Sequence, residues 1–198
     1  MGTCLTNMTT THKPFQRILA IDPLKHGFGW AVLEGDEFLV DCGIRDLQAK
    51  KPERVLAHIA VLIHRYAPHT IVLENTTHRR CRRGDPARAL LHEIVTMAPA
   101  VDIPVSRVSM AKVFRHFRRF GAKNKNAIAR LIADRFPELE RLVPPRRRVW
   151  MSEDDRMAVF DAIALALVSM DATWAPHEPQ DVVSRIRAIV RRARQSVN

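Results

Sequence analysis

The feature that most limits how this chain can fold is one carboxylate inside an otherwise apolar segment. Residues 158–168 read AVFDAIALALV, and Asp161 has apolar neighbours on every side of the helix that this segment is expected to form. A charged side chain in such surroundings is costly unless it is paired or coordinates a metal ion. The segment therefore predicts a buried helix in which Asp161 has a partner.

The other hydrophobic patterns predict a mixed sheet covered by helices. Three short apolar segments, one pair of them separated by a Gly-Asp turn signal, predict an antiparallel meander over residues 17–22, 28–35 and 37–44. Helical and strand patterns then alternate: helices at 52–66, 85–100, 110–117, 124–136 and 152–170, and strands at 70–75 and 103–109. A meander followed by strands that alternate with helices is typical of the α/β class.

The two ends of the chain differ from this central part in composition. Residues 1–16 are polar and show no periodicity, which predicts a flexible tail. We expect the folded domain over residues 17–173. Residues 174–198 open with a segment rich in helix breakers and continue as a basic amphipathic extension, which is expected either to pack on the domain or to bind a polyanion.

The balance of charge restricts the partners. The chain of 198 residues carries 32 Lys and Arg against 21 Asp and Glu, a net charge of +11. Such an excess is typical of proteins that bind nucleic acid or an anionic membrane. No apolar run approaches the length of about 18 residues that spans a bilayer, and no secretory signal is evident, so we expect a cytoplasmic protein without a membrane contact. The three scattered cysteines indicate neither a disulfide framework nor a zinc site.

Two further carboxylates stand at the ends of predicted strands. Asp22 closes the first strand and Glu74 closes the fourth. Taken singly, each has a structural explanation, as a turn or capping residue. If the two strands are neighbours in the sheet, both carboxylates lie side by side, and a helix packed there brings Asp161 to the same point. Three carboxylates so close together repel one another unless a cation neutralises them.

The chemistry of such a cluster points to a phosphodiester substrate. Carboxylate oxygens select Mg²⁺ or Mn²⁺. Two such ions about 4 Å apart hold the attacking water and the leaving oxygen of an in-line displacement at phosphorus. A polyanionic substrate also explains the net charge of +11.

The segments that carry these residues resemble those of RuvC-like nucleases in the RNase H-like superfamily. The first hairpin of that family resembles ILAIDPLKHGFGWAVLEG (residues 18–35), and its fourth strand, which bears a catalytic Glu, resembles IVLEN (71–75). Its terminal helix, which bears a catalytic Asp, resembles FDAIALAL (160–167). Its segment after the fifth strand resembles RFGAKNKNAIARLIADRFPEL (119–139). The ordered set extends over residues 17–170.

This resemblance implies a fold, an activity and partners. It implies the RNase H-like fold, with a mixed five-stranded sheet whose first three strands are antiparallel and whose later strands are parallel, flanked by helices. It implies a metal-dependent endonuclease in which Asp22, Glu74 and Asp161 hold two Mg²⁺ or Mn²⁺ ions and hydrolyse DNA, with four-way or otherwise branched DNA as a candidate substrate. It also implies a homodimer, with residues 87–98 at the interface. Two alternatives stay open: a protein of the same fold that binds structured nucleic acid without cutting it, and an RNA-processing nuclease.

The chain departs from the family at one position. A second acid or a His stands three residues before the helix Asp in RuvC-like resolvases, and Ala158 occupies that place here. Asp154 lies seven residues before Asp161, which predicts the same helix face, and we take it as the candidate fourth catalytic and metal-binding carboxylate. Asp155 is the competing candidate for this fourth carboxylate. Both acids could instead belong to a helix start capped by Ser152.

Basic residues near the acidic positions are candidates for nucleic-acid binding. Two Arg-rich segments, residues 78–85 and 144–150, are interpreted as clamps on phosphates or, alternatively, as solvated surface. Two lysines in GAKNKN stand where the family resemblance places lysines that contact DNA near the cleaved phosphate. The full set of candidates is Lys25, Arg79, Arg80, Arg82, Arg83, Lys123, Lys125, Arg146, Arg147 and Arg148.

Overall fold

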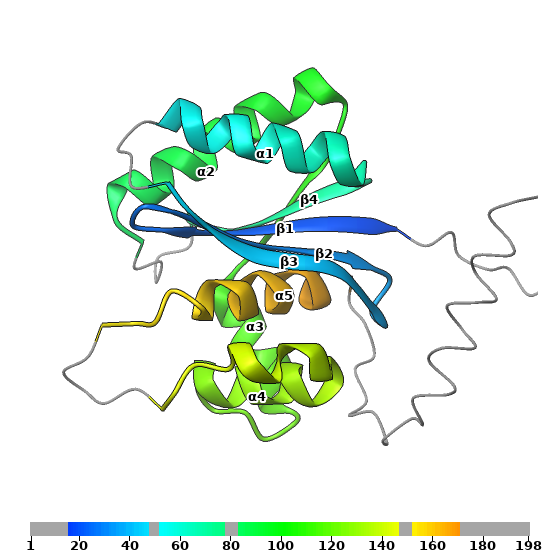
Figure 1. The fold of residues 1–198 in the computed structure, drawn as a ribbon, viewed down its shortest axis with the longest axis vertical. Coiled ribbons are helices and arrows are strands. Elements are labelled where there is room, and N and C mark those ends of the chain that lie inside the picture. Colours follow the sequence, from blue (N-terminus) through cyan, green and yellow to red (C-terminus); the bar gives the residue numbers. More distant parts are fainter. Residues whose placement is uncertain (1–15, 48–51, 78–82, 147–151, 171–198) are drawn as a thin grey trace, which may run out of the picture.

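A five-stranded mixed sheet with helices on both faces forms the centre of the molecule (Figure 1). The structure, a computed structural model, describes residues 16–47, 52–77, 83–146 and 152–170. The sheet has the order β3-β2-β1-β4-β5. The strands are β1 (Arg17–Leu24), β2 (Gly27–Glu34), β3 (Phe38–Asp46), β4 (Thr70–Glu74) and β5 (Val105–Val108). The first three are antiparallel, and β4 and β5 continue the sheet parallel to β1, as predicted.

The helices form two layers, one on each face of the sheet. Figure 1 shows α1 (Pro52–Tyr66) and α2 (Asp85–Met97) on one face, and α5 (Met157–Ser169) with α3 (Met110–Arg118) and α4 (Lys125–Arg135) on the other. Two 3₁₀ helices, η1 (Ala98–Val101) and η2 (Pro137–Leu142), follow α2 and α4. None of the helices in the described ranges is long and apolar enough to cross a bilayer.

The strand β1 shows how the sheet supports both layers. Successive side chains of a strand point to opposite faces. Ile18 and Ala20 belong to the apolar cluster formed with α3, α4 and α5, whereas Leu19 and Ile21 belong to the cluster formed with α1 and α2. A strand covered on both faces needs an almost continuous apolar run, and this requirement explains the sequence RILAI before Asp22.

Among the helices of the described residues, α5 is the most deeply buried. Every residue from Met157 to Val168 is buried, because α5 packs on β1 and β2 on one side and on α3 and α4 on the other. The close approach to the sheet depends on small residues: a Cβ atom added to Gly29 of β2 would lie 2.5 Å from the Cβ atom of Ala158. The prediction of a buried helix around Asp161 is confirmed.

The beginning of α5 differs from the sequence prediction. The helix was expected from residue 152, but it starts at Met157, and its N-cap, Arg156, makes no side-chain cap. The Asp154 carboxylate accepts hydrogen bonds from the backbone N–H of Arg156 at 3.0 Å and from the Arg156 guanidinium. Such a local turn competes with helix formation. The prediction that Asp154 shares a helix face with Asp161 is therefore wrong, and Ser152 is not the cap.

Several predicted segments lie outside the described residues. They include residues 1–15 of the expected tail, the whole basic extension at 174–198, and parts of the two Arg-rich segments, at 78–82 and 147–150.

Candidate active site

The ends of β1 and β4 place two carboxylates side by side. The two strands are parallel neighbours with Ile21 opposite Leu73, so the next residues in register are Asp22 and Glu74. Both side chains are buried, with exposed fractions of 2% for Asp22 and 6% for Glu74. The condition set in the sequence analysis, that the first and fourth strands are neighbours, is met, and their parallel pairing is the reason the two acids meet.

The helix α5 brings the third carboxylate to the same end of the sheet. Asp161 is 5% exposed, and its negative charge is among the causes that raise the pKa of Asp22. Asp161 comes from a helix that packs across β1 and β2, more than a hundred residues later in the chain. The three carboxylates expected from the sequence therefore belong to one buried acidic cluster.

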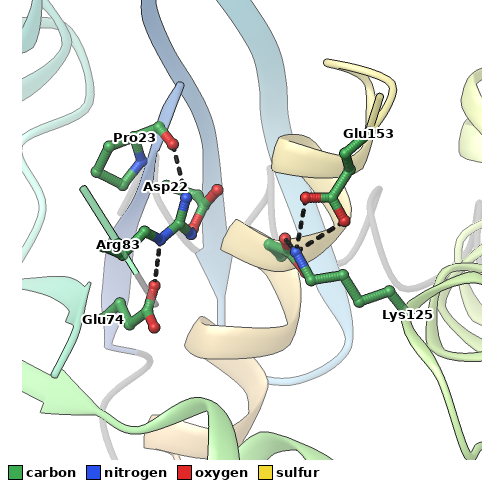
Figure 2. A network of polar contacts seen from close by, with 7 residues as sticks. Asp22, Pro23, Glu74, Arg83, Lys125 and Glu153 are labelled. Carbon is green, nitrogen blue, oxygen red and sulfur yellow. Dashed lines mark hydrogen bonds and ion pairs between the residues drawn. The ribbon is translucent and has the colours of Figure 1, made fainter. Parts of the chain in front are cut away.

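Arg83 bridges the two strand-end carboxylates. Its Nε donates to Glu74 Oε2 at 2.6 Å, one terminal nitrogen donates to Asp22 Oδ1, and the other donates to the carbonyl oxygen of Pro23 at 2.9 Å (Figure 2). Arg83 immediately precedes Gly84, the N-cap of α2. One guanidinium thus ties the start of α2 to the ends of β1 and β4.

Lys125 neutralises the third carboxylate. Its Nζ lies 2.6 Å from Asp161 Oδ2 and 3.0 Å from Glu153 Oε1 (Figure 2). Lys125 is the first residue of α4, and the side chain of the preceding residue, Asn124, accepts a hydrogen bond from Ala127 N and caps that helix. The helix start therefore positions the lysine toward the acidic cluster.

The electrostatics of the cluster are dominated by burial. Burial raises the pKa of Asp22 well above its ordinary value, and repulsion from Asp161 adds to this effect, which the attraction of Arg83 and Lys125 only partly offsets. Burial also raises the pKa of Asp161, although Lys125 lowers it. Burial lowers the pKa of Lys125, but its two carboxylate partners outweigh burial and the pKa is raised. The carboxylates are held in a place where their charge is costly, which is typical of functional sites.

The acidic cluster fits a hard divalent cation in its donor chemistry. Buried carboxylate oxygens from three elements are the ligands that Mg²⁺ and Mn²⁺ prefer. In the present side-chain arrangement, however, Arg83 and Lys125 contact these oxygens, and among the described residues no three His, Cys, Asp or Glu side chains are grouped closely enough to hold a metal ion. A metal ion could bind Asp22, Glu74 and Asp161 only after the two cationic side chains move.

The remaining predicted site residues lie in different surroundings. Asp154 is paired with Arg156, whose hydrogen bonds lower the pKa of Asp154, and Asp155 is exposed. Lys25, Lys123 and Arg146 are exposed, as expected of residues that bind a polyanion. Five predicted nucleic-acid contacts lie outside the described residues: Arg79, Arg80, Arg82, Arg147 and Arg148.

The sequence analysis missed one residue beside Asp161. Glu153 shares the Lys125 ammonium with Asp161 and is among the charges that raise the pKa of Asp161. The run of acids in SEDD was a visible signal. It was assigned to Asp154 and Asp155 because the helix was expected to start too early.

Comparisons with known proteins bear on the fold. No protein-family model matches the sequence, and no curated protein matches it. RuvC from Thermus thermophilus matches in structure with 18% sequence identity and a TM-score of 0.56, covering 77% of this chain and 92% of that chain. T. thermophilus RuvC in complex with a Holliday junction substrate matches with 17% identity and a TM-score of 0.57, covering 77% and 91%. The yeast mitochondrial Holliday junction resolvase Ydc2 matches with 14% identity and a TM-score of 0.53, covering 79% of each chain. The chain therefore has the RuvC-type RNase H-like fold that the sequence resemblance implied.

Proposed function

We propose that this protein is a metal-dependent endonuclease that hydrolyses phosphodiester bonds in DNA, and that branched DNA of the four-way type is its substrate. The observation that carries the proposal is the convergence of Asp22, Glu74 and Asp161 at one end of the sheet. Two of the structures with the same fold are a RuvC bound to a Holliday junction substrate and a Holliday junction resolvase. The net charge of +11 supports a polyanionic substrate.

The cost of the acidic cluster argues for a catalytic role. Hydrophobic residues would fill the same space without the desolvation penalty that burial imposes on Asp22 and Asp161. Such a cluster is explained when its charge is used for binding or chemistry. In the proposed enzyme, Asp22, Glu74 and Asp161 hold Mg²⁺ or Mn²⁺. A pair of these ions would polarise the phosphate and lower the pKa of the attacking water.

Arg83 and Lys125 have two roles in this proposal. In the structure they pair with the carboxylates, which offsets part of the repulsion within the cluster. Once they leave the carboxylates, the guanidinium and the ammonium are free to donate to phosphate oxygens, for which both groups are suited. The exposed Lys25, Lys123 and Arg146 would extend the contact along the DNA backbone.

The proposal is tested by a cleavage assay on matched substrates. A labelled four-way DNA junction, a linear duplex, a single strand and an RNA duplex are incubated with the wild type, Asp22→Asn or Glu74→Gln, in Mg²⁺, Mn²⁺ or EDTA. We expect nicking of the junction that requires the metal and falls more than about 100-fold in either variant, because loss of a metal ligand exceeds the 10- to 100-fold effect of losing an outer-shell partner. Metal-dependent cleavage that survives in both variants would disprove the mechanism, and cleavage of RNA alone would reassign the substrate.

The internal ion pairs also support a second candidate function. Each of the three carboxylates already contacts Arg83 or Lys125, so each has a cationic partner within the protein itself. A protein that binds structured nucleic acid without cutting it would need no metal ion beyond these internal ion pairs. Calorimetry separates the two functions: a non-catalytic protein would show no Mn²⁺ uptake that disappears in Asp161→Ala.

The proposed junction substrate also implies a homodimer, since two strands have to be cut. The family resemblance places the interface on residues 87–98, which comprise residues 87–97 of α2 and the first residue of η1. Light scattering with and without a four-way junction measures the stoichiometry. A monomer in both conditions would count against junction resolution and leave nuclease activity untouched.

A further inference from the structure

We propose that Glu153 is the fourth carboxylate of the metal site, and that the Lys125 ammonium occupies the cation position between Glu153 and Asp161 until a divalent ion replaces it. This inference rests on the proposed function and names a residue that neither the family pattern nor the sequence analysis assigned. It is carried by the geometry around Lys125 Nζ.

The first observation is that one small cationic group is held between two carboxylates. Lys125 Nζ lies 2.6 Å from Asp161 Oδ2 and 3.0 Å from Glu153 Oε1. The two oxygens therefore contact the same nitrogen atom. A divalent ion in its place would need both oxygens at the shorter distances at which they bind Mg²⁺, which requires a movement of Glu153. The Glu153 side chain can make that movement, because it is 45% exposed and precedes the first residue of α5.

The second observation is the packing at position 158. Ala158 is 2% exposed, and it packs so closely on the sheet that a Cβ atom on Gly29 would lie 2.5 Å from its Cβ and from its carbonyl carbon. Gly29 pairs with Asp22 across β1 and β2, so α5 packs against the sheet directly beside the acidic cluster. A longer side chain at 158 would have to push α5 away from β2. A carboxylate for this side of the site has to come from outside the helix, and Glu153, which precedes α5, shares the Lys125 ammonium with Asp161.

The third observation excludes the neighbouring acids from this place. The Asp154 carboxylate is held by the backbone and guanidinium of Arg156. Asp155 is exposed, whereas Glu153 shares the Lys125 ammonium with Asp161.

The balance of charge agrees with a cation-binding site. The four carboxylates of Asp22, Glu74, Asp161 and Glu153 are bridged in pairs, two by Arg83 and two by Lys125. Four negative charges face two positive ones, which leaves the ionised cluster with a negative excess that a divalent ion would neutralise.

Calorimetric titration with Mn²⁺ of the full chain, without nucleic acid, tests the inference. The variants are Glu153→Gln, Lys125→Met, the double variant, Asp161→Asn and a charge-matched control, Asp134→Asn, whose side chain is exposed on α4. We expect Glu153→Gln to weaken Mn²⁺ binding by about tenfold or more, as loss of a ligand should. Lys125→Met should tighten binding, because it removes the competing ammonium, and Asp134→Asn should leave it unchanged.

The double variant distinguishes a ligand from a residue that only holds Lys125 in place. If Glu153 acts through Lys125, Glu153→Gln has no effect on Mn²⁺ affinity in the Lys125→Met background, and the inference is overturned while the proposed function stands. If Glu153 binds the ion, the loss of affinity persists in that background. A wild-type protein that takes up no Mn²⁺, with Asp161→Asn giving the same result, would overturn this inference and the proposed metal-dependent function together.

Discussion

Gly29 of β2 and Ala158 of α5 touch so closely that a methyl group on the glycine would overlap the alanine, at 2.5 Å from its Cβ atom. Close packing of this kind leaves no room for another atom, so a Cβ added at Gly29 would force α5 away from the sheet. The contact lies beside Asp22, which pairs with Gly29 across the two strands. The contact between this glycine and this alanine therefore sets how closely α5, which carries Asp161, approaches Asp22 on the sheet.

Gly29→Ala tests this contact. We expect a loss of about 1–3 kcal/mol in the free energy of unfolding, the usual cost of overpacking a core, together with weaker Mn²⁺ binding because α5 carries Asp161. Gly43→Ala is the matched control in the same sheet, since its added Cβ would meet the Trp30 side chain at 3.3 Å, a milder contact. Urea denaturation and calorimetry measure both effects. Equal losses in the two variants would show that the Gly29 contact has no special role.

Arg83→Gln tests whether the guanidinium competes with a metal ion. Arg83 contacts both Asp22 and Glu74, so its removal should tighten Mn²⁺ binding in the absence of DNA by about tenfold, the equivalent of one charge-assisted hydrogen bond of about 1.5 kcal/mol. DNA binding should weaken, and the salt dependence of log K should lose about one unit of slope, because one phosphate contact is lost.

The control for that measurement is Arg54→Gln, which removes an exposed arginine from α1, on the face of the sheet opposite α5. Unchanged Mn²⁺ affinity in Arg83→Gln would mean that Arg83 does not occupy the metal's place.

The buried carboxylates predict a specific pH dependence of stability in EDTA. The pKa values of Asp22 and Asp161 are raised above their ordinary value of 3.8, chiefly by burial, so the folded state binds protons that the unfolded chain has already released. The stability that each group contributes is present at low pH and is lost as the pH rises toward its folded pKa, by up to about 1.4 kcal/mol per pH unit for each proton.

This dependence is isolated by comparison with the Asp161→Asn variant. The difference in unfolding free energy between the wild type and the variant should shift against the wild type as the pH rises above the ordinary carboxyl pKa of 3.8, because only the wild type has the Asp161 carboxyl. Saturating Mn²⁺ should remove the shift. A difference that moves in favour of the wild type over the same range would contradict the raised pKa.

Asn124→Ala tests how α4 positions Lys125. The Asn124 side chain caps the helix by accepting a hydrogen bond from Ala127 N at 2.9 Å, so its loss should cost about 1 kcal/mol of stability and loosen the first turn, where Lys125 lies. Ser109→Ala removes the equivalent cap of α3 and should cost a similar amount. Only Asn124→Ala should also change Mn²⁺ affinity. The same affinity change in both variants would indicate a general loss of stability.

Much of the architecture follows from the sequence because its periodicities are local. The apolar run before Asp22, the meander and the alternation of helices and strands identified the α/β class and the order of its elements. A carboxylate within an all-apolar helix also required burial and a partner for Asp161, as the structure shows. These inferences need only the spacing of residues along the chain.

What the tertiary structure alone decided is which charged groups meet. The contacts of Arg83 with Asp22 and of Lys125 with Asp161 join residues that are far apart in the sequence, and no local pattern distinguishes an arginine that binds a carboxylate from one that binds a phosphate. The start of α5 was mispredicted because a side-chain hydrogen bond of Asp154 competed with the helix. Because the helix was expected to begin at residue 152, the acids of this segment were assigned to the wrong positions and Glu153 was missed. The sequence determined that the Asp161 carboxylate had to be buried, and it placed Asp22 and Glu74 at the ends of two apolar strands. Three-dimensional packing determined their distances and their partners, since these depend on contacts between segments that the chain brings together only when it folds.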